Sequence, residues 1–223
     1  LSLHDALPIS SSGVHESQSR LWENIVGRSR GFWKFFYPQV QSYFPSQLGN
    51  VSLDAFYQAI NKVQRSVIRM DADEVTYNLH VMIRFDLELM MLEGKLQVRD
   101  LPEAWNERYY QDLGVVPQND SDGVLQDVHW YTGQIGGMFQ CYTLGNLMSA
   151  QFFEAAVTEQ SDIIPKIEQG NFSTLHNWLK DNIYQHGCKY TAAELIKSVT
   201  GTALRIDPFI RYIRQKYGQL YML

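Results

Sequence analysis

The spacing of the histidines in this 223-residue chain restricts the kinds of metal site that it can form. The six histidines are His4, His15, His80, His129, His176 and His186. A zinc site built on one helix needs two histidines four positions apart, so that both imidazoles point the same way. No two histidines of this sequence are three or four residues apart. The chain therefore contains no standard two-histidine zinc motif of its own.

Other common catalytic motifs are also missing from the sequence. It has no G-x-S-x-G nucleophile elbow and no phosphate-binding P-loop, and the Gly133, Gly136 and Gly137 set has the wrong spacing for dinucleotide binding. Cys141 and Cys188 are too few for a disulfide framework or a cysteine-rich zinc site. Two plain thiols favour a reducing, cytoplasmic location.

Three short polar segments remain as candidates, and each has an ordinary structural alternative. The first is His15-Glu16-Ser17-Gln18, which could serve helix capping. The second, Ile68 to Glu74, places an arginine before an acidic helix start, a common arrangement. The third, Gly123 to Trp130, gathers glutamine, aspartate and histidine in a loop beside tryptophan. Loops that concentrate such groups serve function as readily as packing.

The elements that position these segments are predicted to be helices. Apolar residues recur at helical spacing almost throughout, which indicates an all-α fold. The expected helices are 15–29, 31–45, 52–63, 72–93, 100–114, about 133–159, 173–186, 191–199 and 208 onward. The last two are expected to begin with a capping box of Thr191 and Glu194 and with Asp207 as the cap. Ser66 to Met70 is the only plausible strand. No repeat or low-complexity linker divides the chain, so we expect a single helical body.

Composition excludes several classes of protein. A hydrophobic fraction of 45% with 19% charged residues is typical of a globular chain. The net charge of −5 argues against nucleic-acid binding, which needs clustered positive charge. No segment approaches the length of about 18 consecutive apolar residues that predicts a membrane span. The first dozen residues lack the pattern of a signal peptide.

Taken together, the three polar segments resemble motifs of the thermostable, Taq-type carboxypeptidase family of zinc metallopeptidases. His15 to Gln18 is similar to the family's H-E-S/G-Q motif, Ile68 to Glu74 to its I/Y-R-x-x-A-D-E motif, and Gly123 to Trp130 to its G-x-x-Q-D-x-H-W motif. The motifs follow the family's order, and the similarity runs from about Gly13 to Tyr221.

The resemblance implies that residues 13–223 form the C-terminal part of a larger helical catalytic domain with an active-site cleft. Family members are about twice as long, and their H-E-x-x-H helix, which supplies two zinc-binding histidines and the general base, precedes the H-E-S/G-Q segment. We find no such helix here. Residues 1–12 are expected to be non-native or disordered, as from a translated adapter or an assembly artefact.

The family's site residues can be carried over by motif position. Glu16 corresponds to the third protein ligand of zinc, and cobalt would also suit such a site. Arg69 corresponds to the residue that binds the free C-terminal carboxylate of the substrate, and His129 to a hydrogen-bond donor for the scissile carbonyl. By looser analogy, Tyr142 is a second donor to the oxyanion. Gln126 and Asp127 are expected to shape the loop.

The resemblance implies a cytoplasmic zinc carboxypeptidase that releases single C-terminal amino acids from peptides and is a homodimer when complete. With one of three metal ligands, this chain is expected to be inactive alone. Two alternatives stay open. One is a non-enzymatic helical module that binds a partner through aromatic residues around Trp33 and Phe36. The other is a helical zinc endopeptidase or dipeptidase, which the surroundings of Arg69 would distinguish.

Overall fold

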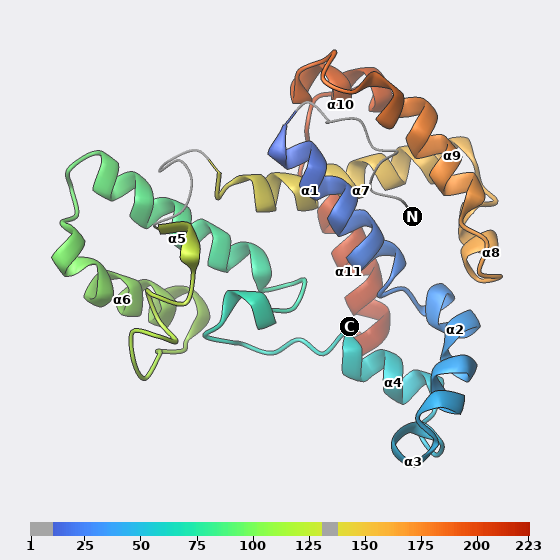
Figure 1. Cartoon of the computed structure of the whole chain (residues 1–223), viewed down its shortest axis with the longest axis horizontal. Helices are drawn as coiled ribbons and strands as arrows, with labels where there is room; N and C mark the ends of the chain where they lie inside the picture. Colours follow the sequence, from blue (N-terminus) through green and yellow to red (C-terminus); the bar gives the residue numbers. More distant parts are fainter. Residues whose placement is uncertain (1–10, 131–137) are drawn as a thin grey trace. The chain divides into compact units, whose positions relative to one another are not determined.

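The computed structural model describes residues 11–130 and 138–223, and every regular element within these ranges is a helix (Figure 1). The all-α prediction is therefore confirmed. Predictions for residues 1–10, and for a helix opened by Gly133, Gly136 and Gly137, lie outside the described residues. In the described part of the chain, no helix has both the length and the apolar character required to cross a bilayer.

The contacts divide the chain into two compact units, where the sequence predicted one body. Of the described residues, the first unit takes 11–61 and Leu144–Leu223, and the second takes most of Lys62–Thr143. The boundary lies within the first turn of α7 (Cys141–Glu159), so this helix begins in one unit and continues in the other. No low-complexity linker marks the division, which is why composition did not predict it.

The first unit is built from nine helices and short turns around one apolar core. Besides most of α7, its α-helices are α1 (Ser12–Arg20), α2 (Arg30–Tyr43), α3 (Pro45–Leu48), α4 (Leu53–Ile60), α8 (Ile163–Ile167), α9 (Ser173–Asn182), α10 (Ala192–Thr200) and α11 (Asp207–Tyr221). Val14, Phe152 and Leu179 are fully buried in its core. Because α1 and α7 both contribute to this core, the position of the H-E-S-Q segment is fixed by packing.

The first predicted helix, 15–29, is split in the structure. After α1 the chain widens into a π-helix, η2 (Leu21–Val26), and the amide of Gly27 donates to the carbonyl of Trp22, five residues back, at 2.8 Å. A Cβ atom at Gly27 would lie 2.9 Å from that carbonyl oxygen. Glycine therefore permits the wide turn, and the Ser29 hydroxyl then caps α2 by accepting from the amide of Phe32.

The second unit is organised by two helices, α5 (Tyr77–Leu92) and α6 (Leu101–Leu113), which lie side by side (Figure 1). Ile83 and Leu87 of α5 pack with Trp105 and Tyr109 of α6 in a buried cluster. The 3-10 turns of this unit are η3 (Arg69–Asp71), η4 (Val98–Asp100) and η5 (Val128–Trp130). Gly114 ends α6 in the left-handed conformation, with φ of 69°, as the sequence predicts.

The strand predicted at Ser66 to Met70 is wrong. Ile68 is extended, with φ of −99° and ψ of 120°, but the 3-10 turn η3 follows it. The side-chain amide of Gln126 takes the place of a neighbouring strand: its Oε1 accepts from the amide of Arg69 at 2.8 Å, and its Nε2 donates to the carbonyl of Val67 at 2.8 Å. The backbone is thus satisfied without a sheet.

Two predicted helix starts are shifted, and one is confirmed. The long helix predicted from residue 72 begins at Tyr77, because the Asp73 carboxylate holds the preceding turn by accepting from the amides of Val75 and Thr76. Asp207, expected as a cap, is the first residue of α11 instead. At α10, the predicted capping box of Thr191 and Glu194 is present.

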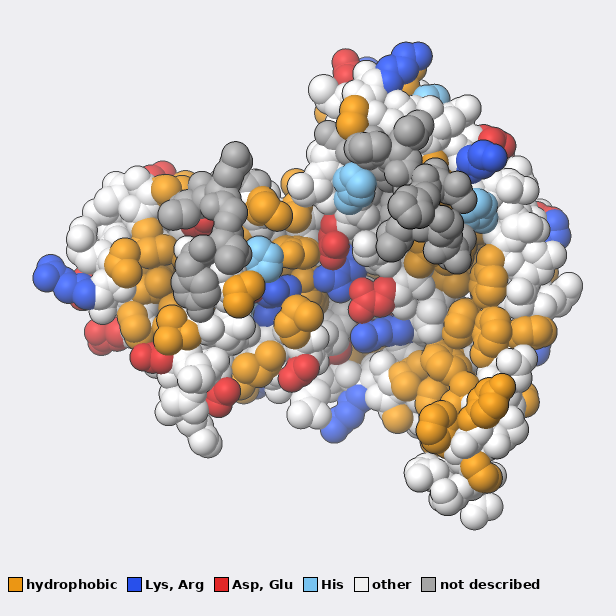
Figure 2. Space-filling view, viewed as in Figure 1, with side chains coloured by type: hydrophobic (Ala, Val, Ile, Leu, Met, Phe, Trp, Pro, Cys, Tyr) orange, Lys and Arg blue, Asp and Glu red, His pale blue; other side chains and the backbone are white. Residues whose placement is uncertain are grey.

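The aromatic residues of α2 are partly used inside the first unit. Trp33 packs edge-on against Phe56 with ring centroids 4.7 Å apart, and Phe36 stacks on Phe172 at 6.1 Å. Figure 2 shows hydrophobic side chains gathered on one face over the region of α2 and α3, and Tyr43 and Phe44 are among the exposed aromatic residues. Trp33 and Phe36 are therefore half-buried packing residues.

Candidate active site

The first candidate segment, His15 to Gln18, lies within α1. Ser11 is the N-cap of this helix, and its hydroxyl accepts from the amide of Val14 at 3.3 Å. Glu16 comes more than one turn after the helix start, at the fifth helical position. Helix capping therefore does not explain this carboxylate.

The Glu16 carboxylate is partly exposed and, among the described residues, has one partner. Its Oε1 accepts from Nε of Arg20 at 2.6 Å, and the side chain of Glu16 is 18% exposed. Behind it runs α7, where a Cβ atom added to Gly145 would lie 2.6 Å from Cγ of Glu16. The missing side chain at Gly145 thus leaves the space that Glu16 occupies, and a larger residue would clash with the glutamate. We call this close contact of Gly145 with Glu16 the Gly145 cradle.

The polar residues that follow Glu16 have structural roles. The Ser17 hydroxyl is buried and donates to the carbonyl of Val14 at 2.6 Å. The Gln18 amide donates to the oxygen of Ser17 at 3.0 Å and accepts from the hydroxyl of Tyr184 at 3.1 Å. Gln18 therefore joins α1 to the 3-10 turn η6 (Tyr184–His186), and this hydrogen bond helps to hold the helix that carries Glu16.

The donor chemistry of Glu16 suits a divalent metal ion, since a carboxylate oxygen is a common zinc ligand. Within residues 11–130 and 138–223, however, no three His, Cys, Asp or Glu side chains are grouped so that they could hold a metal ion. The described residues therefore fit one ligand of such a site. The remaining ligands would have to come from elsewhere.

The second candidate, Arg69, belongs to the other unit and is 7% exposed. Its Nε donates to Oδ2 of Asp127 at 2.8 Å, and its Nη1 donates to the Tyr77 hydroxyl at 2.9 Å. The rings of Phe139 and Tyr142 lie 5.2 and 5.1 Å from the guanidinium carbon. Burial alone would lower the pKa of Arg69, but Tyr77 and Asp127 raise it above its usual range. The group is a fixed cation.

Among the described residues, Nη2 of Arg69 has no hydrogen-bond partner. A guanidinium held at two nitrogens keeps its plane and presents the third in a defined direction. Arg69 can therefore meet an anionic group of a ligand without giving up Asp127 or Tyr77.

Asp127 connects Arg69 to the third candidate, His129. One carboxylate oxygen, Oδ2, accepts from Arg69, and the other, Oδ1, accepts from the amide of His129 at 3.1 Å and contacts its Nδ1. Burial would raise the pKa of Asp127, but the hydrogen bonds from His129 and the charge of Arg69 lower it below its usual range. The buried carboxylate is therefore ionised at neutral pH.

Tyr142 completes this network. Its hydroxyl lies 2.9 Å from Nε2 of His129, and the two rings meet edge to face with centroids 5.7 Å apart. The order of contacts is Arg69, Asp127, His129 and Tyr142, and all four residues belong to the second unit. The structure therefore joins three of the four predicted site residues, Arg69, His129 and Tyr142, while Glu16 lies in the first unit.

Sequence reasoning missed most of the importance of Asp127, which it expected only to shape the loop. Two further residues were also missed: Tyr77, a partner of Arg69, and Arg84, which forms a buried ion pair with Glu88 at 2.7 Å. Arg84 also covers the ring of Trp130, the last residue of the third motif, at 3.1 Å from its centroid. Tyrosine and arginine on the buried face of a predicted helix were the available signal.

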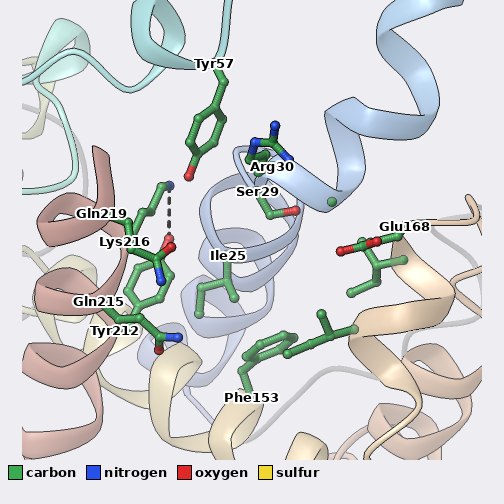
Figure 3. Close-up of a pocket in the computed structure, with 13 residues that line it drawn as sticks. Ile25, Ser29, Arg30, Tyr57, Phe153, Glu168, Tyr212, Gln215, Lys216 and Gln219 are labelled. Atoms are coloured by element: carbon green, nitrogen blue, oxygen red, sulfur yellow. Dashed lines mark hydrogen bonds between the residues drawn. The ribbon is translucent and has the colours of Figure 1, made fainter. Parts of the chain in front are cut away.

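The first unit also contains a pocket that involves none of the predicted site residues (Figure 3). Its volume is about 250 Å³. Lys216 of α11 lies in its wall, with Nζ 3.2 Å from the hydroxyl of Tyr212, and Ile25 and Phe153 supply apolar surface. The pocket holds no acidic or histidine cluster that would suit a metal ion in the described residues.

Comparison with known proteins gives consistent matches. The family model described as carboxypeptidase Taq (M32) metallopeptidase matches residues 4–217. Thermostable carboxypeptidase 1 of Thermus thermophilus is 49% identical over 211 residues, covering 95% of this chain and 41% of that protein. Carboxypeptidase 1 of Bacillus subtilis is 39% identical over 96% of this chain and 42% of its own length.

Solved structures agree with the sequence matches. The crystal structure of the M32 carboxypeptidase from Deinococcus radiodurans R1 is 53% identical and superposes with a TM-score of 0.93, covering 97% of this chain and 44% of that one. A second crystal structure, described as BsuCP, has a TM-score of 0.91 at 38% identity, covering 96% of this chain and 43% of that one. The chain thus spans about two-fifths of the length of the relatives it matches.

Proposed function

Because the chain belongs to the carboxypeptidase Taq (M32) metallopeptidase family, we propose that it forms part of a metallocarboxypeptidase that releases single amino acids from the free C-terminus of peptides. The observation that carries this proposal is the network in which Asp127 joins Arg69 to His129 and His129 joins Tyr142. A cation, an imidazole and a phenol are the groups that recognition of a carboxylate and of a peptide carbonyl requires.

We assign Glu16 as one protein ligand of a zinc ion, a site that cobalt would also suit. The Gly145 cradle and the partly exposed carboxylate support this assignment. When bound, such an ion supplies Lewis acidity toward the peptide carbonyl and lowers the pKa of water. The resemblance implies two further ligands from an H-E-x-x-H helix, a motif that this sequence does not contain. By itself the chain is proposed to be inactive.

The remaining assignments concern binding and orientation of the substrate. Arg69 binds the terminal carboxylate through Nη2, while Asp127 and Tyr77 hold the rest of its guanidinium. His129 and Tyr142 lie beside the scissile carbonyl and stabilise the negative charge that develops on its oxygen. Desolvation in this mostly buried setting strengthens both interactions.

The location and assembly of the protein are further parts of the proposal. Cys141 and Cys188 are the two cysteines of the sequence, too few for a disulfide framework, which suits a reducing cytoplasmic compartment. By the family resemblance, the complete protein is a homodimer. Peptides with a free C-terminus are the proposed substrates.

The test uses a chimera in which this chain replaces the matching segment of the Thermus thermophilus relative. With zinc or cobalt, the chimera should release C-terminal amino acids from free-acid peptides and leave the same peptides intact when amidated. Arg69→Lys should lower kcat/KM for the free acid by about 100-fold or more, since a single lysine amine cannot keep the contacts with Asp127 and Tyr77 and also present a fixed donor to the carboxylate. Arg99→Lys, at an exposed position, is the control.

Three outcomes would favour the alternatives. Equal cleavage of free-acid and amidated peptides would indicate an endopeptidase, and hydrolysis confined to dipeptides would indicate a dipeptidase. A chimera that folds and binds metal but cleaves nothing would favour a non-enzymatic module. The half-buried packing of Trp33 and Phe36 gives no particular support to that module, because these rings contact Phe56 and Phe172 of the same unit.

A further inference from the structure

Asp127 is a carboxylate whose two oxygens serve two different groups of the candidate site. Oδ2 accepts from Nε of Arg69 at 2.8 Å, and Oδ1 accepts from the amide of His129 at 3.1 Å and contacts Nδ1 of the same ring. Only 5% of the residue is exposed. These contacts fix the position of Asp127, and Asp127 in turn fixes the positions of Arg69 and His129.

The contact with Nδ1 fixes the proton of His129. An ionised carboxylate accepts hydrogen bonds and cannot donate one, so Nδ1 of His129 must carry hydrogen. In the neutral ring Nε2 then has a lone pair, and the Tyr142 hydroxyl at 2.9 Å is the donor to it. The chain of hydrogen bonds has one direction, from Tyr142 through His129 to Asp127.

We propose that Asp127 is a positioning residue that selects the Nδ1-protonated form of His129, and that the same carboxylate holds Arg69 in place. The functional meaning of this inference depends on the proposed carboxypeptidase activity. It refines the expectation from motif position: in the neutral ring Nε2 is an acceptor, so it has no proton to donate to a carbonyl oxygen. A second proton on the ring turns Nε2 into a donor and releases the Tyr142 hydroxyl to donate elsewhere.

Asparagine at this position separates the proposal from a merely structural role. The Asn side chain has one acceptor oxygen and one donor amide, whereas Asp127 faces three donors, namely Nε of Arg69 and the amide and Nδ1 of His129. The charged guanidinium is the strongest of these donors and keeps the Asn oxygen, so the Asn amide faces Nδ1 and favours a proton on Nε2. Asp127→Asn should therefore move the ring proton from Nδ1 to Nε2 in most molecules.

The experiment measures ring nitrogen chemical shifts by NMR in the nitrogen-labelled 223-residue chain at about pH 8.5, well above the ordinary histidine pKa of about 6.5. The signals of His129 are identified by their absence from the spectrum of His129→Gln. We expect the proton on Nδ1 in the unmodified chain and mainly on Nε2 in Asp127→Asn. The control, Asp120→Asn in the same loop at an exposed position, should leave the ring unchanged.

A proton on Nε2 in the unmodified chain, or an unchanged ring in a folded Asp127→Asn, overturns the proposal. If Asp127→Asn does not fold, Tyr142→Phe decides, since it removes the partner of Nε2 and keeps Asp127. A retained Nδ1 proton in Tyr142→Phe supports the proposal, and a shift to Nε2 refutes it. These spectra need no metal and no substrate, so loss of peptidase activity in the chimera would refute the proposed function without touching this result.

Discussion

Glu16 on α1 and Asp127 in the loop before η5 are acidic residues of two different family motifs, and their surroundings differ. Within the part of the chain that the structure describes, Glu16 has a single partner, Arg20 on the same helix, and its side chain is 18% exposed. Asp127 has donors on both oxygens, from Arg69 and His129, and is 5% exposed. A partly exposed carboxylate with one partner can exchange that partner for a ligand. A buried carboxylate that accepts hydrogen bonds at both oxygens instead holds its neighbours in a fixed orientation.

The largest effect expected from this comparison is on removal of the buried carboxylate. Asp127→Ala leaves the Arg69 guanidinium buried without its counter-ion, which should lower the free energy of unfolding by about 3–5 kcal/mol. Asp120→Ala, in the same loop and exposed, should change it by less than about 0.5 kcal/mol. Urea unfolding followed by circular dichroism measures both. A loss below about 1 kcal/mol for Asp127→Ala would contradict the role given to this ion pair.

The pH dependence of stability tests a buried imidazole of the second unit, that of His80. Burial, and the positive charge of Arg69, lower the pKa of His80 from about 6.5 to about 4. Between these values the unfolded chain takes up a proton that the folded chain does not, so stability falls as pH falls. Over the whole range between the two pKa values, the free energy of unfolding falls by about 3 kcal/mol.

The measurement is the free energy of unfolding between pH 7 and 4.5. His80→Gln should flatten its pH dependence, and His176→Gln, at a half-buried position of the other unit, should not. Equal slopes for the unmodified chain and His80→Gln would show that this buried imidazole is not responsible.

The next effect tests the cradle of Glu16. Gly145→Ala places a Cβ atom 2.6 Å from Cγ of Glu16 and 3.1 Å from its backbone carbon, so α1 and α7 must move apart. We expect a loss of about 1–3 kcal/mol. Gly218→Ala on α11 meets nothing within 4 Å and should gain up to about 1 kcal/mol from helix propensity. Thermal unfolding compares the two glycines, and equal shifts would mean that the cradle is not tight.

The smallest effect is expected at Glu16 itself. Glu16→Gln removes one ion pair between neighbouring turns of a helix, so the free energy of unfolding should change by less than about 1 kcal/mol. The same substitution in the chimera should weaken zinc binding at least 100-fold, measured by competition with a chelator. A strongly destabilised Glu16→Gln would mean that the carboxylate is structural, as Asp127 is.

The sequence predicted features that depend on residues close together in the chain. The capping box at Thr191 and Glu194 and the end of α6 at Gly114 are examples, since a few neighbouring residues decide them. The structure joins Arg69 and His129, which come from two different family motifs, in one network through Asp127. The roles of Glu16, Arg69, His129 and Tyr142 stay predictions.

The sequence did not predict features that join distant segments. Asp127 meets Arg69 across 58 positions, and Gln126 reaches the same segment, so no local pattern could reveal either contact. The false strand has the same cause, because an extended segment satisfied by one side chain has the composition of a strand. The π-helix after α1 depends on how Gly27 fits under Trp22, which periodicity does not encode.

The hydrogen bond between the Gln126 side chain and the backbone amide of Arg69 gives this amide an unusual behaviour in hydrogen–deuterium exchange. In a helix or sheet, exchange of a backbone amide reports the opening of a whole ladder. Here the amide of Arg69 is protected by the carboxamide of a half-buried Gln126, so rotation of one side chain is enough to expose it. Its exchange rate therefore reports on the loop that carries Asp127, and Gln126→Glu would alter it while the helices on either side keep theirs.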